Sequence, residues 1–331
     1  MSTLYLLEQG AKLVKEHKKL VVEKDGKVLL EIPEFKIDRV LLFGNVQITT
    51  QAMKFLLESG IETALFNIYG KLVGKLTPIE SKNVFLRVAQ YECSKDENFK
   101  LSIAKTIVEG KIKNAKVMLQ RYVRNHPDEI DFNELLKNLD SCLEELPNKT
   151  KVSTVIGIEG RSSAIYFDAF GKMFRKELQF TVRTRRPPLD PVNSLLSLGY
   201  TLITNEMFSL VSAIGFDPYI GFLHGLEYGR PSLALDLIEE FRHAVVDRLT
   251  LELINKETLK LDDFETKEEG VYLKDDARKK YFFYYEKRIL TCIQDNDTKE
   301  EINFRKIFLK QVQNFSKTIE GKVPYSPFLI K

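Results

Sequence analysis

The period of the hydrophobic pattern changes once along the chain, and this change limits the possible fold more than any other feature of the sequence. Up to about residue 73, apolar and polar residues alternate in short segments, as is typical of β-strands. Beyond Leu76-Thr77-Pro78, apolar residues recur every three to four positions, as is typical of amphipathic helices. The pattern predicts a domain boundary near residues 74–82, in a segment short enough to act as a hinge.

The first part of the chain predicts a small, mainly antiparallel β domain with one helix. The pair Asp25-Gly26, between two apolar segments, is a two-residue hairpin signal. One helix is expected at Thr49–Glu58, ahead of Gly60. The expected strands are Leu4–Leu7, Lys12–Glu16, Leu20–Glu23, Val28–Ile32, Val40–Phe43 and Ile61–Phe66, followed by a hairpin at Tyr69–Val73.

The second part predicts long amphipathic helices and no sheet. They are expected at about Lys82–Tyr91, Asn98–Val123, Phe132–Glu145, Val152–Leu178, Pro191–Ala213, Ser232–Ile254, Asp275–Thr291 and Lys299–Lys317. The helix at 98–123 carries more basic than acidic residues, which suits either a solvated face or contact with a duplex backbone. The fold class expected is therefore multidomain α+β, with a small β domain followed by a larger all-α domain.

Composition excludes several classes of protein. No stretch of eighteen apolar residues occurs, which argues against a membrane span. Cys93, Cys142 and Cys292 are far apart and lack CxxC spacing, which excludes a cysteine-rich zinc site and favours a reducing cytoplasm. The formal charge of +3 is too small to establish a nucleic-acid partner.

One histidine and several acids stand in unusual contexts. His224 lies in a glycine-flanked loop, Gly221 to Gly225, ahead of a helix for which Ser232 is the expected N-cap. On that helix Asp236 shares a face with Glu239 and Glu240, among leucines. Acids near a core need a partner or a ligand, although a solvated acidic edge at a helix N-terminus is the alternative.

Glu159 is the second unusual acid. It follows an apolar run and has a glycine two residues before it and another directly after it, at Gly157 and Gly160. Because glycine costs helix stability, the pair suggests close approach of another chain or a ligand. An ion pair between Glu159 and Arg161 is the alternative interpretation. One histidine with two or three carboxylates is a donor set that suits manganese or magnesium, which can assist phosphoryl transfer.

A third element is a basic loop. Arg183, Arg185 and Arg186 precede Pro187-Pro188, and Asn193 follows in the first turn of the next helix. Three arginines held by a diproline can grip phosphates bidentately, although a simple exposed basic loop would have the same composition.

These segments resemble a known family. Three segments are similar, in the same order along the chain, to signatures of the CRISPR-associated protein one family, the integrase–endonucleases of spacer acquisition. They are Gly157-Ile158-Glu159-Gly160, the run 185–200, and the run from Gly221 to His224 with 232–242. The resemblance implies a β-sandwich-like N-terminal domain, here 1–76, that serves dimerisation, and an α-helical catalytic domain, here 77–331.

The resemblance also implies the roles of individual residues. Glu159, His224 and Glu239 would hold Mn²⁺ or Mg²⁺, with Asp236 as a nearby acid of the catalytic site that shares the ion. Some relatives use aspartate where Glu239 stands. The expected DNA-binding residues are Arg183, Arg185, Arg186, Asn193 and Arg242.

The activity implied is metal-assisted transesterification, in which the 3′-hydroxyl of a short duplex fragment (prespacer) attacks a phosphodiester of the CRISPR repeat. The expected partners are double-stranded DNA, a second copy of the chain and a small second adaptation protein, with no membrane. Two other interpretations use the same residues: a structure-selective nuclease of branched DNA, and a non-catalytic DNA-binding scaffold.

Overall fold

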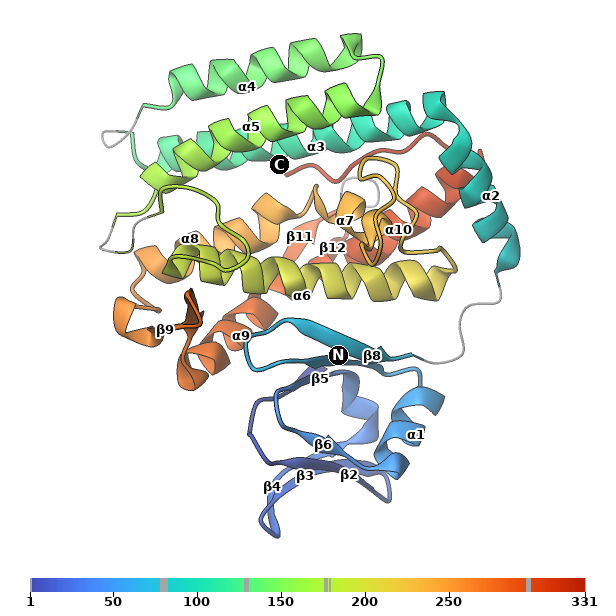
Figure 1. Cartoon of the computed structure of the whole chain (residues 1–331), viewed down its shortest axis with the longest axis vertical. Helices are drawn as coiled ribbons and strands as arrows, with labels where there is room; N and C mark the ends of the chain where they lie inside the picture. The colour runs from blue at the N-terminus through green and yellow to red at the C-terminus, as the bar shows by residue number, and fades with distance from the viewer. Residues whose placement is uncertain are drawn as a thin grey trace. The chain divides into compact units, whose positions relative to one another are not determined.

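The computed structural model describes residues 2–77, 83–127, 131–175, 178, 180–295 and 299–330 (Figure 1). The chain divides into two compact units, one of residues 1–80 with 278–286 and the other of residues 81–277 with 287–331. A strand-rich region followed by a helical region confirms the predicted α+β class. The predicted hinge falls largely on residues 78–82, outside the described residues, and the division into 1–76 and 77–331 stays a prediction.

The strand-rich unit contains two four-stranded sheets, with strand orders β1-β5-β7-β8 and β4-β3-β2-β6. The strands are β1 (Ser2–Leu6), β2 (Lys12–Glu16), β3 (Lys19–Lys24), β4 (Lys27–Pro33), β5 (Ile37–Phe43), β6 (Gln47–Ile48), β7 (Glu62–Phe66) and β8 (Leu72–Leu76). β1 pairs with β5, β5 with β7, and β2 with β6 in parallel. The pairs β2–β3, β3–β4 and β7–β8 are antiparallel, so the prediction of a mainly antiparallel domain is correct for only half of these pairings. The parallel pairs arise because β2–β4 and α1 (Thr50–Glu58) act as crossover connections, which the sequence pattern did not reveal.

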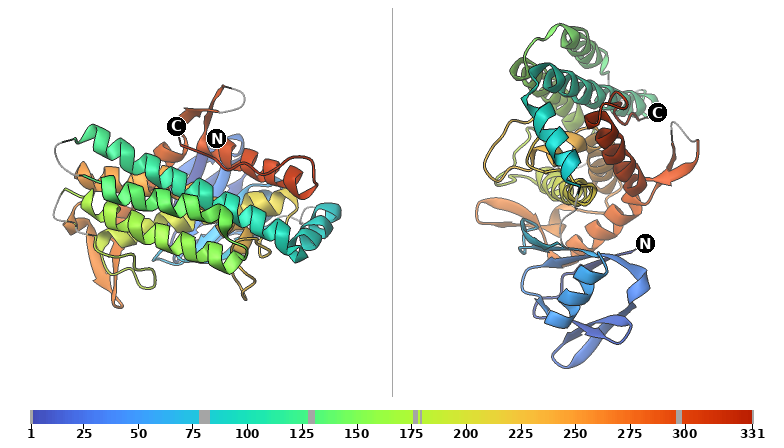
Figure 2. Two further views of the ribbon diagram at one scale, coloured as in Figure 1. Left: turned by 90° about the horizontal axis from the view of Figure 1, so that it is seen from above. Right: turned by 90° about the vertical axis from the view of Figure 1, so that its right-hand side faces the viewer.

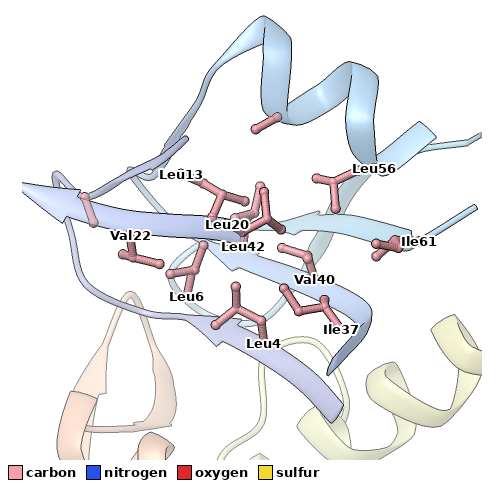
Figure 3. Close-up of a cluster of buried hydrophobic side chains, with 12 residues drawn as sticks. Leu4, Leu6, Leu13, Leu20, Val22, Ile37, Val40, Leu42, Leu56 and Ile61 are labelled. Atoms are coloured by element: carbon pink, nitrogen blue, oxygen red, sulfur yellow. The ribbon is translucent and has the colours of Figure 1, made fainter. Parts of the chain in front are cut away.

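The core of this unit lies between its two sheets (Figure 3). Because side chains alternate along a strand, one face of each sheet is apolar and faces the other sheet. The buried side chains from β1, β5, β2 and β3 include Leu4, Leu6, Val40, Leu42, Leu13, Leu20 and Val22. Leu56 of α1 joins the same cluster. This packing is the β-sandwich that the resemblance implies.

The helical unit is built around three helices that pack side by side: α3 (Glu97–Asn125), α4 (Asn133–Glu145) and α5 (Val152–Lys172) (Figure 2). The other helices of eight or more residues are α2 (Val84–Lys95), α6 (Pro191–Ile214), α8 (Arg248–Asn255), α9 (Asp275–Ile289, of which 278–286 belong to the first unit) and α10 (Phe304–Ile319). No helix among the described residues is long and apolar enough to cross a membrane.

The predicted helix Ser232–Ile254 is interrupted. α7 covers only Ser232–Ile238, a turn follows at 239–241, and a π-helix (η3, His243–Asp247) leads into α8. Ser232 does not cap α7, because its hydroxyl donates to the carbonyl of Gly225 instead. Periodicity could not reveal this break, since apolar residues continue through it.

Two small hairpins were also missed in the helical part of the sequence. They are β9 (Phe264–Lys267) with β10 (Gly270–Leu273), and β11 (Cys292–Gln294) with β12 (Glu301–Asn303). The last helix accordingly starts at Phe304, capped by Asn303, rather than at Lys299.

Candidate functional site

Asp236 organises the loop that carries His224. Its side chain is fully buried and accepts hydrogen bonds from the backbone N–H groups of Phe222, Leu223 and His224, at 2.6, 3.0 and 3.0 Å. His224 Nδ1 lies 2.6 Å from Asp236 Oδ1. Because a carboxylate accepts hydrogen bonds and does not donate them, Nδ1 is the donor, and Nε2 is the ring nitrogen left to bind a ligand. Asp236 therefore fixes the tautomer and orientation of His224, and its oxygens face the loop.

Glycine is required at the start of this loop. A Cβ atom added to Gly221 would lie 2.7 Å from Ser232 Cβ and 2.8 Å from Asp236 Oδ2. The loop can approach α7 closely enough to bind Asp236 only because residue 221 has no side chain.

Lys111, from the middle of α3, joins Glu159 and Glu239. Its ammonium nitrogen forms an ion pair with Glu159 Oε1 and lies 2.7 Å from Glu239 Oε2. Ser163, one turn along α5, donates to the same Glu159 oxygen at 2.9 Å. Arg242 contacts Glu239 Oε1 at 2.9 Å. Two carboxylates and two cations from α3, α5 and the turn after α7 thus form one cluster, which we call the carboxylate cluster.

The cluster keeps both carboxylates ionised. Burial alone would raise the pKa of Glu239, but the charges of Arg242 and Lys111 hold it well below its ordinary value. Burial likewise opposes ionisation of Glu159, and Lys111 outweighs it, so that the pKa of Glu159 is lowered.

Arg242 connects the carboxylate cluster to a second buried network. Its guanidinium lies 4.6 Å from the ring centroid of Tyr200, and the Tyr200 hydroxyl donates to Asp247. Asp247, in the π-helix, also accepts from Tyr166 at 3.0 Å and contacts His243 Nδ1 at 2.7 Å. Arg242 was predicted to bind DNA, and its side chain is in fact held between Glu239 and Tyr200.

The basic loop divides into buried and exposed residues. Asn193 is fully buried, and its Oδ1 accepts from Arg183 at 2.7 Å and from the Thr184 N–H at 2.9 Å. In this structure Asn193 fastens the loop to α6 rather than facing outward as a DNA contact. Arg183 is further tied to Ser197 at 3.1 Å. Arg185 and Arg186 are exposed, as phosphate-binding residues need to be.

Glu159 lines an open cleft of about 480 Å³ between α5 and the basic loop. Ser163 and Asp168 lie on its α5 side, and Arg183 and Arg185 on the other. His224 lines a smaller hollow of about 180 Å³, with Ile156 of α5 and Lys100 of α3. A cleft with arginines on one side and a carboxylate such as Glu159 on the other is chemically suited to hold a phosphodiester together with a metal ion.

Glu240 belongs to a separate network, although it adjoins Glu239. It is buried and accepts from Tyr325 at 2.6 Å, from Gln311 at 3.1 Å and from the N–H of Phe328. Burial raises its pKa to about 7, against the effect of these hydrogen bonds. The ring of Phe328 also stacks on Phe241 at 5.1 Å. Glu240 thereby anchors residues 325–328, which we call the C-terminal strap.

The donor set fits a hard divalent ion, since it offers two carboxylates and an imidazole whose other nitrogen is held by an acid. No group of three or more His, Cys, Asp or Glu side chains within the described ranges forms a ready-made metal site. Glu159 and Glu239 converge on the ammonium of Lys111 instead.

Sequence reasoning did not single out Lys111 or Asp247. Lys111 entered only as part of the basic helix at 98–123, yet it lies in phase with the buried residues Ile107, Ala104 and Ala115. Asp247 follows Val245 and Val246, which are fully buried. A charged residue in phase with an apolar stripe is the signal that would have found both.

This chain is similar to known proteins over most of its length. The family model described as CRISPR associated protein Cas1 matches residues 4–287. A relative from Thermus thermophilus, named CRISPR-associated endonuclease Cas1 3, is 35% identical over 334 residues, which cover 100% of this chain and 98% of the relative.

Solved structures show the same fold. A Cas1 protein from Thermotoga maritima is similar with a TM-score of 0.84 and 26% identity, over 99% of this chain and 100% of that one. A chain of a complex titled Cas6-RT-Cas1–Cas2 also has a TM-score of 0.84 and 26% identity, over 100% of this chain and 36% of that one. The family suggested by the sequence motifs is confirmed: this chain belongs to the CRISPR-associated Cas1 family.

Proposed function

We propose that this chain joins short DNA fragments to a CRISPR repeat array in a metal-dependent strand-transfer reaction, at the site formed by Glu159, His224 and Glu239. The observation that carries the proposal is the pairing of Asp236 with His224 Nδ1, because it presents the other imidazole nitrogen as a ligand. Mn²⁺ or Mg²⁺, bound by these three side chains, would supply Lewis-acid activation of the scissile phosphate and the attacking oxygen.

The other side chains would bind and align the DNA. The exposed Arg185, which lines the cleft, and the exposed Arg186 next to it in the chain would neutralise phosphates, while Asn193 and Arg183 hold the loop that presents them. Asp236 is proposed to position His224 rather than to share the ion, since its oxygens are occupied by the loop.

The reaction exchanges one phosphodiester for another. The 3′-hydroxyl oxygen of the fragment forms a bond to phosphorus, and the bond from phosphorus to the 3′-oxygen of the repeat strand breaks. The proton of the attacking hydroxyl is transferred overall to the leaving oxygen. Because the bond formed and the bond broken are of the same kind, the reaction needs no separate source of energy. Alignment and charge neutralisation are therefore the main requirements.

The proposed assembly is a homodimer together with the small second adaptation protein. The Cas1–Cas2 complex among the similar structures supports the second partner. Hydrolytic cleavage of branched DNA is the second candidate function, and the endonuclease name of the Thermus thermophilus relative favours it. It needs the same residues, with water in place of the DNA hydroxyl.

An integration assay tests these proposals. It combines labelled duplex with free 3′-hydroxyls, a supercoiled repeat plasmid, the partner protein and Mn²⁺. Wild type is compared with Glu159→Ala, His224→Ala and the control Lys113→Ala, which alters an exposed lysine of α3 paired with Glu109. Joining that only the first two variants lose supports strand transfer. Cleavage without joining favours the nuclease, and DNA binding without either reaction would favour the scaffold.

A further inference from the structure

Lys111 is an unusual residue to find in the carboxylate cluster. Its side chain is only 10% exposed, and it lies on a face of α3 that otherwise packs in the core. Lysine is rarely buried unless it is paired, and here it is paired twice, with Glu159 and with Glu239. Two carboxylate oxygens from different elements meeting at one nitrogen is the arrangement that a bridging cation produces.

The cluster is electrically balanced without a metal ion. Glu159 and Glu239 contribute two negative charges, and Lys111 and Arg242 contribute two positive charges. A divalent ion on the same carboxylates would leave an excess of about two positive charges in a largely buried site, which is costly unless a cation leaves or an anion enters.

The two cations differ in their freedom to leave. Arg242 is 14% exposed and lies over the ring of Tyr200 while it contacts Glu239. Lys111 has a flexible four-carbon side chain and a strongly hydrated ammonium group. Lys111 contacts one oxygen of each carboxylate, so an ammonium at this place and a metal ion on the same oxygens would exclude each other.

We propose that Lys111 is an internal counter-cation: in the metal-free protein it takes the place of the metal ion between Glu159 and Glu239, and metal binding displaces it. This inference rests on the proposed metal-dependent function. It assigns Lys111 two effects, which are to hold the two carboxylates together in the absence of metal and to compete with the ion for them. Metal affinity is then set partly by a side chain that is not a ligand.

The test measures Mn²⁺ binding by titration calorimetry at one pH, with no DNA present. Lys111→Met removes the competing charge, and we expect it to tighten Mn²⁺ binding about tenfold or more. Lys111→Arg replaces a displaceable ammonium with a guanidinium that can pair with both carboxylates at once, and we expect it to weaken binding about tenfold. Lys113→Met is the matched control on the same helix and should bind as wild type does.

Thermal unfolding gives a second readout. Without metal, Lys111→Met should have a lower Tm than wild type, because the two carboxylates then repel each other, and Mn²⁺ should raise its Tm more than that of wild type. If Lys111→Met does not fold, Lys111→Arg carries the metal-binding test, and the charge-balanced double variant Lys111→Met/Glu159→Gln carries the folding test. The double variant should fold without metal, and failure to do so would contradict the charge-balance argument.

The outcomes separate this inference from the proposed function. Mn²⁺ binding by wild type, with equal or weaker binding by Lys111→Met, would overturn the role of Lys111 and leave the metal-dependent function intact. Absence of Mn²⁺ binding in wild type and in all variants would instead overturn the metal site itself, and Lys111 would then be a permanent counter-ion.

Discussion

The imidazole of His224 is held by a carboxylate that is entirely buried, with His224 Nδ1 2.6 Å from Asp236 Oδ1. The same carboxylate binds three successive backbone N–H groups, so the loop and the ring are fixed by one side chain. Orientation of His224 is therefore a property of the folded protein and does not depend on a bound ion.

We expect Asp236→Asn to lower the rate of DNA joining and the affinity for Mn²⁺ by about 10- to 100-fold, the usual effect of losing the acid behind a metal-binding histidine. The physical reason is that an amide can donate to Nδ1 and so favours the wrong tautomer. Joining assays and calorimetry measure the two effects, and circular dichroism checks the fold. Asp140→Asn, which alters an acid of α4 that pairs with Lys116 outside the cleft, is the control. Unchanged joining by a folded Asp236→Asn would contradict this role.

Gly221→Ala should destabilise the protein by about 1–3 kcal/mol, because the new methyl group would overlap Ser232 and Asp236. Chemical denaturation measures the change in the free energy of unfolding. Gly225→Ala is a matched control in the same loop, since a Cβ there meets nothing within 4 Å. Equal stability of the two variants would show that the loop yields to the extra methyl group.

Arg185→Ala and Arg186→Ala should each weaken DNA binding and lower the slope of log K against log[salt] by about 0.9, the effect of losing one phosphate contact on a duplex. Fluorescence anisotropy, measured at several salt concentrations between about 50 and 200 mM, gives the slope. An unchanged slope in both variants would show that neither arginine contacts a DNA phosphate.

Asn193→Ala provides the contrast to the arginine variants. Because Asn193 is fully buried and fastens the basic loop, its loss should reduce stability by about 1–3 kcal/mol, as expected for buried hydrogen bonds left without a partner. Denaturation measures this change. The salt slope of DNA binding should remain that of wild type, and a drop equal to that of Arg185→Ala would identify Asn193 as a direct contact.

Glu240 should make stability depend on pH in the direction opposite to that of most acids. Its pKa is raised from the ordinary value of 4.5 to about 7, so the folded protein binds a proton that the unfolded chain has lost. Stability should therefore fall as the pH rises from about 4.5 to about 7, by about 3 kcal/mol for this group, and level off above that range. Chemical denaturation of wild type and of Glu240→Gln across this pH range measures the effect. The same pH dependence of stability in both proteins would contradict the raised pKa of Glu240.

The sequence predicted the elements better than their pairings. Alternation located most of the strands, because burial of one face imposes a period of two. It could not reveal that β1 and β5 are parallel, since pairing is decided by connections between sheets. The π-helix at His243–Asp247 was equally hidden, because apolar residues continue through it.

The candidate site residues were singled out by their surroundings, and their roles as metal ligands were inferred from the family resemblance. Glu159, His224 and Glu239 stood out as polar groups in apolar or glycine-rich surroundings, and the structure brings Glu159 and Glu239 to one lysine. The burial of Asn193 and the position of Lys111 depend on tertiary packing, which a single sequence does not encode locally.

The π-helix makes the arrangement of the buried charges depend on the number of residues between 243 and 247. Deleting one residue from 243–247 would favour a regular α-helix, and the chain beyond it would turn by about 100° relative to Glu239. Asp247 would then leave Tyr166 and Tyr200, and the support behind Arg242 would be lost. Single-residue deletions in this segment should be tolerated far less well than substitutions that keep its length, because spacing as well as chemistry determines where the charges lie.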